Sequence, residues 1–203
     1  DVCSSDLLNF PELFSTENLA IDTLISPEQA VTDHITRLLD TPGALQVLDF
    51  AGGRIRLIGV KARADGLLIG HQLSELRQHL PNVDVRVAAI YRRGIAIKPL
   101  GETRIEADDE VFFLADQKNI SLVMSELRKL DSRPTKRIFI AGGGNIGRNL
   151  ARMIEKKYSV KVLERSRDRA RNIAEDLLNS IVLVGDCADE DLLREENIDQ
   201  TDI

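Results

Sequence analysis

The sequence is poor in cysteine, in basic charge and in long apolar runs. Its 203 residues include only two cysteines, Cys3 and Cys187, and neither belongs to a C-x-x-C pair, so we expect a reduced, cytoplasmic setting. The net charge of −6 argues against a nucleic-acid-binding surface, which needs a basic patch. No apolar run approaches the roughly eighteen residues of a transmembrane helix, so we expect no direct membrane span. The hydrophobic fraction of 43% supports a packed core.

Glycine, in contrast, is concentrated in one place. Residues 137–147 read RIFIAGGGNIG, an apolar run that stops at three glycines and is followed by a fourth. Gly142, Gly144 and Gly147 have the G-x-G-x-x-G spacing of a dinucleotide-binding fingerprint. In that fingerprint the first glycine makes the tight turn after a strand, the second lets the backbone approach a pyrophosphate, and the third lets the helix lie close to the sheet. Amides at the helix start, aided by the helix dipole, would receive the phosphate charge.

The surroundings of the glycines strengthen this prediction. Residues 138–141 are apolar throughout, as in a buried parallel strand, and Ile146 and Leu150 begin an apolar face at helical spacing. A second strand, 160–163, leads to Glu164, about twenty residues after the first glycine, where the fingerprint places an acid for ribose hydroxyls. A carboxylate there favours NAD over NADP, because it would repel a 2′-phosphate. The alternative is a phosphate-free βαβ unit whose glycines serve packing only.

Two further residues are candidates for nucleotide contacts. Arg165 follows Glu164 and could stack on an adenine or contact a phosphate. Asp186 follows a third predicted strand, 181–184, and open parallel sheets bind ligands at such strand ends, so we place Asp186 on the adenine side. The helix after the second strand has a basic outer face, which we interpret mostly as solvated charge: Arg165, Arg167, Arg169 and Arg171.

The region before the fingerprint has the pattern of a compact α+β module. Strands at 45–50 and 55–60 are joined by a glycine-containing hairpin turn. Residues 83–91 alternate between apolar and other residues, with Val83, Val85, Val87, Ala89 and Tyr91 on the buried side. A last strand at 111–115 and a closing helix, whose apolar face ends at Leu130, complete the module.

No catalytic constellation is present in this module. Asp108–Glu110 could pass for paired general acids and bases, but a solvated charge run before a strand is the simpler interpretation. Arg92–Arg93, at a hairpin tip, is interpreted in the same way. His71 and His79 are eight residues apart, a spacing with no special meaning for a metal site. The module therefore suits a ligand-sensing or dimerising role better than an active site.

Domain boundaries follow from the linkers and caps. A helix begins with Ser26 as its cap, Pro27 in the first position and Gln29 completing a capping box. Residues 131–136 form a polar linker. Only three parallel strands are expected beyond it, fewer than the six of a complete dinucleotide fold, so we expect an internal fragment of a longer protein. The predicted fold is α/β, with an incomplete, truncated Rossmann-like parallel sheet and a small α+β domain.

The order of these motifs resembles that of the Trk potassium-uptake regulators of the RCK (KTN) family. The resemblance runs from about Pro11 to the end of the sequence. It rests on the capped helix, the segments PGALQV (42–47) and DEVFF (109–113), the glycine fingerprint, VLER (162–165), and Gly185-Asp186. Members of this family contain two tandem copies of a nucleotide-binding RCK N-terminal domain, each followed by an RCK C-terminal domain.

The resemblance implies a division of the chain into four parts. Residues 1–42 would be the tail and crossover helix of a first RCK N-terminal domain, and residues 43–130 its RCK C-terminal domain. Residues 131–136 would be a linker. Residues 137–203 would be the start of a second RCK N-terminal, Rossmann domain. The glycine motif of the first copy lies outside this sequence.

The resemblance also implies regulation rather than turnover. Members are cytoplasmic subunits that form homo-oligomers on a Trk-type membrane potassium transporter, at the inner face of the membrane, and gate potassium flux. They bind NAD(H) and adenine nucleotides such as ATP. Carried onto matching positions, the glycine loop would hold the pyrophosphate and Glu164 the ribose, and Arg165 and Asp186 would add further contacts. The implied cofactor-binding residues are Gly142, Gly143, Gly144, Asn145, Ile146, Gly147, Glu164, Arg165 and Asp186.

Two other functions remain open at the level of sequence. An NAD-dependent oxidoreductase fragment would share the fingerprint, but it would need a proton-transfer residue beside the nicotinamide, and no candidate is evident. A purely structural dimerisation fragment would need no nucleotide at all. Hydride transfer by the full-length protein would favour the first alternative. A melting temperature that no adenine nucleotide shifts would favour the second.

Overall fold

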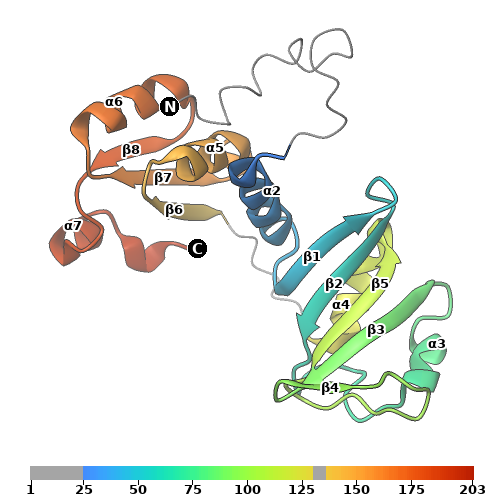
Figure 1. Cartoon of the computed structure of the whole chain (residues 1–203). Coiled ribbons are helices and arrows are strands. Elements are labelled where there is room, and N and C mark those ends of the chain that lie inside the picture. The colour runs from blue at the N-terminus through green and yellow to red at the C-terminus, as the bar shows by residue number, and fades with distance from the viewer. Residues whose placement is uncertain (1–24, 130–135) are drawn as a thin grey trace, which may run out of the picture. The chain divides into compact units, whose positions relative to one another are not determined.

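The computed structural model describes residues 25–129 and 136–203 (Figure 1). The chain divides into two compact units, one of residues 37–134 and the other of residues 1–36 together with 135–203. Each unit contains its own sheet. The expectations for residues 1–24, for Leu130 and for nearly all of the linker 131–136 fall outside the described residues.

The unit of residues 37–134 is built on a five-stranded antiparallel sheet with the strand order β1-β2-β5-β3-β4. Its strands are β1 (Ala44–Phe50), β2 (Ile55–Lys61), β3 (Val85–Arg92), β4 (Ile95–Ile97) and β5 (Glu110–Asp116). Its helical segments are η2 (Leu73–Glu75), α3 (Leu76–His79), η3 (Gln117–Asn119) and α4 (Ile120–Leu127). Figure 1 shows α4 behind the sheet. The predicted α+β module is confirmed.

One line of side chains across the sheet forms the centre of the core. Val47 on β1 pairs with Ile58 on β2, which pairs with Phe113 on β5, so the three lie on the same face. All three are at most 1% exposed. On α4, Val123 is also 1% exposed, and the other core residues of the helix are at most 4% exposed. Burying a side chain of this size stabilises the fold by about 1.5–3 kcal/mol. This core holds the sheet and α4 together.

Strand β3 departs from the predicted alternation. The pairing with β5 shifts between Val87 and Ala89, which leaves Ala88 as an extra residue in a β-bulge. The shift moves the following side chains to the opposite face, so Ile90 is fully buried whereas Tyr91 is 40% exposed. The prediction that Tyr91 continues the buried side was therefore wrong, because strict alternation along a strand does not allow for an inserted residue.

The charged residues beside β3 and β5 are not all solvated. Asp109 has no exposed surface. Its carboxylate accepts hydrogen bonds from Arg92 Nε (2.8 Å) and Arg92 Nη2 (2.9 Å) and from the backbone amide of Glu106 (2.8 Å). This bidentate pair with Asp109 raises the pKa of Arg92 above its usual value. For Asp109 and Arg92 the interpretation as surface charge was wrong, and the pair instead fixes the loop that precedes β5.

Helix α2 (Pro27–Leu39) spans the boundary between the two units. As predicted, it starts after Ser26, whose hydroxyl accepts a hydrogen bond from the Gln29 amide (3.3 Å). The Gln29 side chain, however, donates to Asp33 (2.7 Å). That bond directs the Gln29 side chain along the helix, toward the residue four positions later. The second bond of the predicted capping box, from the Ser26 backbone amide to the Gln29 side chain, is thus replaced by a contact on the helix surface.

The other unit contains a three-stranded parallel sheet with the order β6-β7-β8. Its strands are β6 (Arg137–Ala141), β7 (Ser159–Glu164) and β8 (Ile181–Val184). Its helices are α5 (Asn145–Ile154), α6 (Arg167–Asp176), α7 (Glu190–Glu195) and the short η4 (Ile198–Gln200). Figure 1 shows the three strands side by side with α5 and α6 packed along them. The predicted Rossmann-like α/β arrangement is confirmed.

Strand β6 is bonded on both of its edges. Its backbone amide and carbonyl groups alternate in direction along the strand, and those of the even-numbered residues point toward β7. On the other side, Arg137 O accepts from the amide of Ile203 (3.3 Å) and the Phe139 amide donates to Ile203 O (2.9 Å), the pattern of a parallel pair. These two bonds tie residue 203 to the outer edge of the three-stranded sheet.

Candidate functional site: the carboxyl edge of the parallel sheet

The three segments predicted to bind a nucleotide meet at one edge of the parallel sheet. Gly142 follows β6 and donates its amide to Leu163 O on β7 (2.8 Å). Gly185 follows β8 and donates to Glu164 O at the end of β7 (3.1 Å). These bonds extend the ladder beyond the strands and fix the starts of the loops relative to one another. The edge thus presents the glycine loop, Glu164 and Asp186 in the order of their strands.

Two of the glycines are required by the backbone itself. Gly142 has φ +108°, a value that side-chain-bearing residues rarely adopt. A Cβ atom on Gly147 would clash with the carbonyl oxygen of Gly142. The turn after β6 and the close approach of α5 therefore take the roles predicted from the spacing. Gly143 is also tightly packed, because a Cβ there would displace the end of the Ile173 side chain and crowd Glu164, a constraint that the sequence did not suggest.

The start of α5 is open to solvent. Gly144 is the N-cap, and no side chain caps the helix. The first helical bond runs from the Arg148 amide to Gly144 O (2.9 Å), so the amides before Arg148 have no partner within the helix ladder. Gly142, Gly144, Asn145 and Ile146 are exposed, whereas Gly143 is buried. Amides at the positive end of a helix dipole form the usual seat for a phosphate.

Glu164 lies against this loop rather than pointing into solvent. It is 4% exposed, and its Oε2 accepts the Gly143 amide (3.0 Å) while Oε1 accepts the Ser166 amide (2.8 Å). The Ser166 amide, followed by that of Gly143 and the charge of Arg169, lowers the pKa of Glu164 despite its burial. The carboxylate is thus ionised at neutral pH and ties the end of β7 to the glycine loop.

Arg169 is a part of this site that the sequence did not identify. Its Nη1 lies 3.3 and 3.4 Å from the two carboxylate oxygens of Glu164, although its side chain is 59% exposed. Arg169 is therefore exposed, as the sequence suggested, but it also pairs with Glu164. Its position in the first turn of α6, after the Ser166 cap and five residues beyond Glu164, is the signal that could have indicated the contact.

Arg165 and Asp186 approach each other across the ends of β7 and β8. Arg165 Nε lies 3.8 Å from Asp186 Oδ2, and their side chains are 85% and 49% exposed. The other Asp186 oxygen accepts the Ala188 amide (3.0 Å), which anchors the turn after β8. The structure thus brings the two predicted adenine-side residues together at the rim, outside the buried cluster around Glu164.

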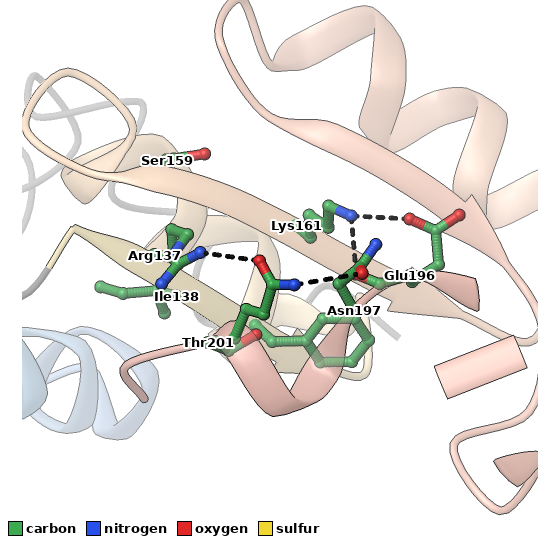
Figure 2. Close-up of a pocket in the computed structure, with 9 residues that line it drawn as sticks. Arg137, Ile138, Ser159, Lys161, Glu196, Asn197 and Thr201 are labelled. Carbon is green, nitrogen blue, oxygen red and sulfur yellow. Dashed lines mark hydrogen bonds and ion pairs between the residues drawn. The ribbon is translucent and has the colours of Figure 1, made fainter. Parts of the chain in front are cut away.

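A pocket of about 270 Å³ lies at the opposite end of the parallel strands (Figure 2). It is lined by Arg137 and Ser159, which begin β6 and β7, and by the segment around η4. Lys161 Nζ donates to the carboxylate (2.7 Å) and backbone oxygen (2.9 Å) of Glu196, and Arg137 Nη1 donates to Gln200 Oε1 (3.3 Å). The predicted cofactor-binding residues do not line it, so it is a separate feature.

The histidines of the other unit form carboxylate pairs. His71 Nδ1 lies 2.7 Å from Glu75 Oε2, and His79 Nδ1 lies 3.1 Å from Glu126 Oε2. The two imidazole rings are in edge contact, with centroids 4.9 Å apart. Within residues 25–129 and 136–203, no group of three or more His, Cys, Asp or Glu side chains is arranged to hold a metal ion. In the same residues every helix is too short or too polar to cross a bilayer.

A second buried carboxylate, Glu155 at the end of α5, is held like Glu164 but away from the glycine loop. It accepts the Leu178 (3.3 Å) and Asn179 (2.9 Å) amides and the Ser180 hydroxyl (2.9 Å). Burial opposes its ionisation, but these bonds outweigh burial and lower its pKa below the ordinary 4.5. A lowered pKa contributes stability that is present above about pH 4.5 and is lost as the pH falls through the folded-state value.

We therefore expect Glu155→Gln to flatten the acid limb of the stability curve. At pH 7 the variant should be less stable by about 1–3 kcal/mol, because the Leu178 and Asn179 amides and the Ser180 hydroxyl lose a charged acceptor. The difference from the native protein should shrink as the pH falls below about 4.5. Urea unfolding between pH 7 and pH 3 measures both effects, with the exposed Glu175→Gln as control. A gap that stays constant with pH would contradict the assignment.

Comparison with known proteins supplies the family. The family models of the TrkA-C domain and the TrkA-N domain match residues 57–128 and 138–203. The chain belongs to the TrkA family. The chain is 53% identical over 191 residues to the Trk system potassium uptake proteins TrkA of Vibrio alginolyticus and Halomonas elongata, and 45% identical over 192 residues to that of Haemophilus influenzae. These alignments cover 94–95% of this chain and 42% of each relative.

Solved structures agree with the TrkA assignment at the level of the fold. A crystal structure of the GsuK RCK domain gives a TM-score of 0.55 at 17% identity, covering 99% of this chain and 40% of that one. The structure of the GsuK channel bound to NAD gives a TM-score of 0.51 at 18% identity, covering 86% and 30%. The TrkA-C and TrkA-N matches and the TrkA relatives confirm the resemblance stated from the sequence, and these structures agree with it in fold.

Proposed function

We propose that this chain is a nucleotide-binding part of a regulatory subunit that gates a membrane potassium transporter. The observation that carries the proposal is the carboxyl edge of the parallel sheet, where the exposed glycine loop lies beside the buried, ionised Glu164. A diphosphate and a ribose are the groups that such an edge binds in nucleotide-binding folds. The names of the relatives, which are potassium uptake proteins, and the NAD-bound GsuK channel support this proposal.

The proposed ligands are NAD(H) and adenine nucleotides such as ATP. The glycine loop of Gly142–Gly147 seats the diphosphate through residues 144–146, which are exposed at the positive end of α5, whereas the Gly142 and Gly143 amides hold the loop on Leu163 and Glu164. Glu164 accepts the ribose hydroxyls. The rim pair of Arg165 and Asp186 contacts the adenine side. The Glu164 carboxylate would repel a 2′-phosphate, so NAD(H) is preferred to NADP(H).

The nucleotide acts by shifting a conformational equilibrium rather than by reacting. A ligand moves a two-state assembly only by its differential affinity for the two states. We propose that the chain forms part of a homo-oligomer on a Trk-type potassium transporter, in the cytoplasm and at the inner face of the membrane. The contacts of Glu164 favour this role over hydride transfer, because each partner donates a hydrogen bond that holds the carboxylate in place.

The domain organisation is proposed on the same family pattern. Residues 1–42 end a first RCK N-terminal domain, residues 43–130 form its RCK C-terminal domain, and residues 137–203 begin a second N-terminal domain after the linker 131–136. The matches of the TrkA-C model to 57–128 and of the TrkA-N model to 138–203 support this division. The compact units divide within α2 (Pro27–Leu39), near residue 36, rather than at residue 42.

Calorimetric titration of the intact protein with NADH tests the proposal. Glu164→Gln should weaken binding by about tenfold or more, because hydrogen bonds to a charged acceptor contribute about 1.5–3 kcal/mol. Glu155→Gln is the matched control: it removes a second buried carboxylate of the same unit, so it should lower stability without changing the affinity. Equal affinity in the Glu164 variant would place the ribose elsewhere. If neither NADH nor ATP binds the native protein, the proposal fails.

A further inference from the structure

The carboxylate of Glu164 is already saturated in the structure. A carboxylate offers about four lone-pair positions for hydrogen bonds. Oε1 is contacted by the Ser166 amide and by Arg169 Nη1, and Oε2 by the Gly143 amide and by the same Arg169 nitrogen. A ribose brings two hydroxyl donors, one for each oxygen. Two of these four contacts therefore have to be given up before a ribose can bind.

The contacts with Arg169 are the ones that can be given up. The backbone amides donate over 2.8 and 3.0 Å, and they belong to a strand end and a loop that the fold holds in place. Arg169 Nη1 reaches the carboxylate only over 3.3 and 3.4 Å, longer than is usual for a charge-assisted bond. Its side chain is 59% exposed, so water can replace the contact when the side chain moves.

We propose that Arg169 occupies the ribose position on Glu164 in the nucleotide-free protein and leaves when the two ribose hydroxyls bind. The inference rests on the proposed function and adds a residue that sets the affinity of the site. Arg169 pairs with the carboxylate in the nucleotide-free protein, and the Gly143 and Ser166 amides hold the carboxylate in place during the exchange. The guanidinium and the ribose diol compete for the same two oxygens.

The competition applies only to ligands that carry a ribose diol. ADP and NADH have to displace Arg169. Inorganic pyrophosphate and 2′,3′-dideoxyadenosine diphosphate bind at the glycine loop but present no diol to Glu164, so they leave Arg169 where it is. Removal of the Arg169 guanidinium should thus change the affinity of the first pair of ligands and not that of the second.

Titration of the intact protein with these four ligands tests the competition. Arg169→Gln should tighten binding of ADP and NADH by roughly two- to fivefold, the range expected for removal of one exposed ion pair. Pyrophosphate and the dideoxy nucleotide should bind as before. Arg171→Gln removes the same charge from an exposed position of the same helix and should change none of the four affinities. The difference between the two variants therefore excludes an effect of net charge.

The result that would overturn the inference is unchanged or weaker ADP binding by a folded Arg169→Gln variant, because Arg169 would then not compete with the ribose. Arg169→Met, of similar length and also uncharged, should give the same tightening and serves if the Gln variant does not fold. Native protein that binds none of the four ligands would contradict the proposed nucleotide site itself. Native protein that binds them while the Arg169 variants leave the affinities unchanged would contradict only the competition.

Discussion

A Gly144→Asp variant should fold normally and lose nucleotide binding. Gly144 has φ −67° and ψ −175°, a conformation open to any residue, and a Cβ atom there would meet nothing within 4 Å. Aspartate is also a better N-cap than glycine, worth a few tenths of a kcal/mol. Its carboxylate, however, would lie over the amides that begin α5. Two unit charges about 4 Å apart near a protein surface repel by about 4 kcal/mol, which corresponds to roughly a thousandfold loss of affinity for NADH or ADP.

Calorimetry and thermal unfolding of the same preparation separate this effect from misfolding. The melting temperature of the aspartate variant should equal or slightly exceed that of the native protein while the binding heat disappears. Gly147→Ala provides the contrast, because its methyl group would clash with the carbonyl oxygen of Gly142. That variant should lose stability and binding together. Native-like affinity in a folded Gly144→Asp protein would show that the phosphates do not lie at the glycine loop.

The glycine loop could be predicted from the sequence because its constraints are local. The positive φ of Gly142 and the contact between Gly147 and the Gly142 carbonyl arise within six residues, so they leave a fixed spacing in the sequence. The parallel strands were predictable for a similar reason. The apolar run 138–141 predicted a buried parallel strand, and the parallel strand is present, although only Ile138 is buried there and Ala141 is exposed. Strand ends then place Glu164 and Asp186 at the same edge.

The partners of the charged side chains could not be predicted in this way. Arg169 and its neighbours on α6 are the same residue type at similar spacing, yet only the tertiary placement of β7 against the first turn of α6 gives Arg169 its carboxylate. The β-bulge at Ala88 could not be predicted either, because the residues before and after it are apolar and the sequence does not show where the pairing shifts. Asp109 is the largest error, because burial of one carboxylate within a run of three acids depends on an arginine seventeen residues away.

Asp109→Ala should destabilise the unit of residues 37–134 by about 3–5 kcal/mol, the range for removal of one partner from a buried ion pair. The substitution leaves the guanidinium of Arg92, whose side chain is 26% exposed, without its two carboxylate bonds. It also removes the acceptor of the Glu106 backbone amide. Because the pair lies where the hairpin of β3 and β4 approaches the start of β5, its loss should release that edge of the sheet. Urea unfolding followed by circular dichroism measures the change.

Asp108→Asn is the matched control for this prediction. Asp108 is the preceding residue, its side chain is 82% exposed, and it pairs with Lys61 over 3.0 Å. Its φ of +71° suits asparagine as well as aspartate, so the backbone should not be strained. An exposed pair of this kind contributes at most about 1 kcal/mol, so the control should unfold within that range of the native protein. Equal stability losses in the two variants would mean that the buried geometry of Asp109 contributes nothing beyond ordinary surface charge.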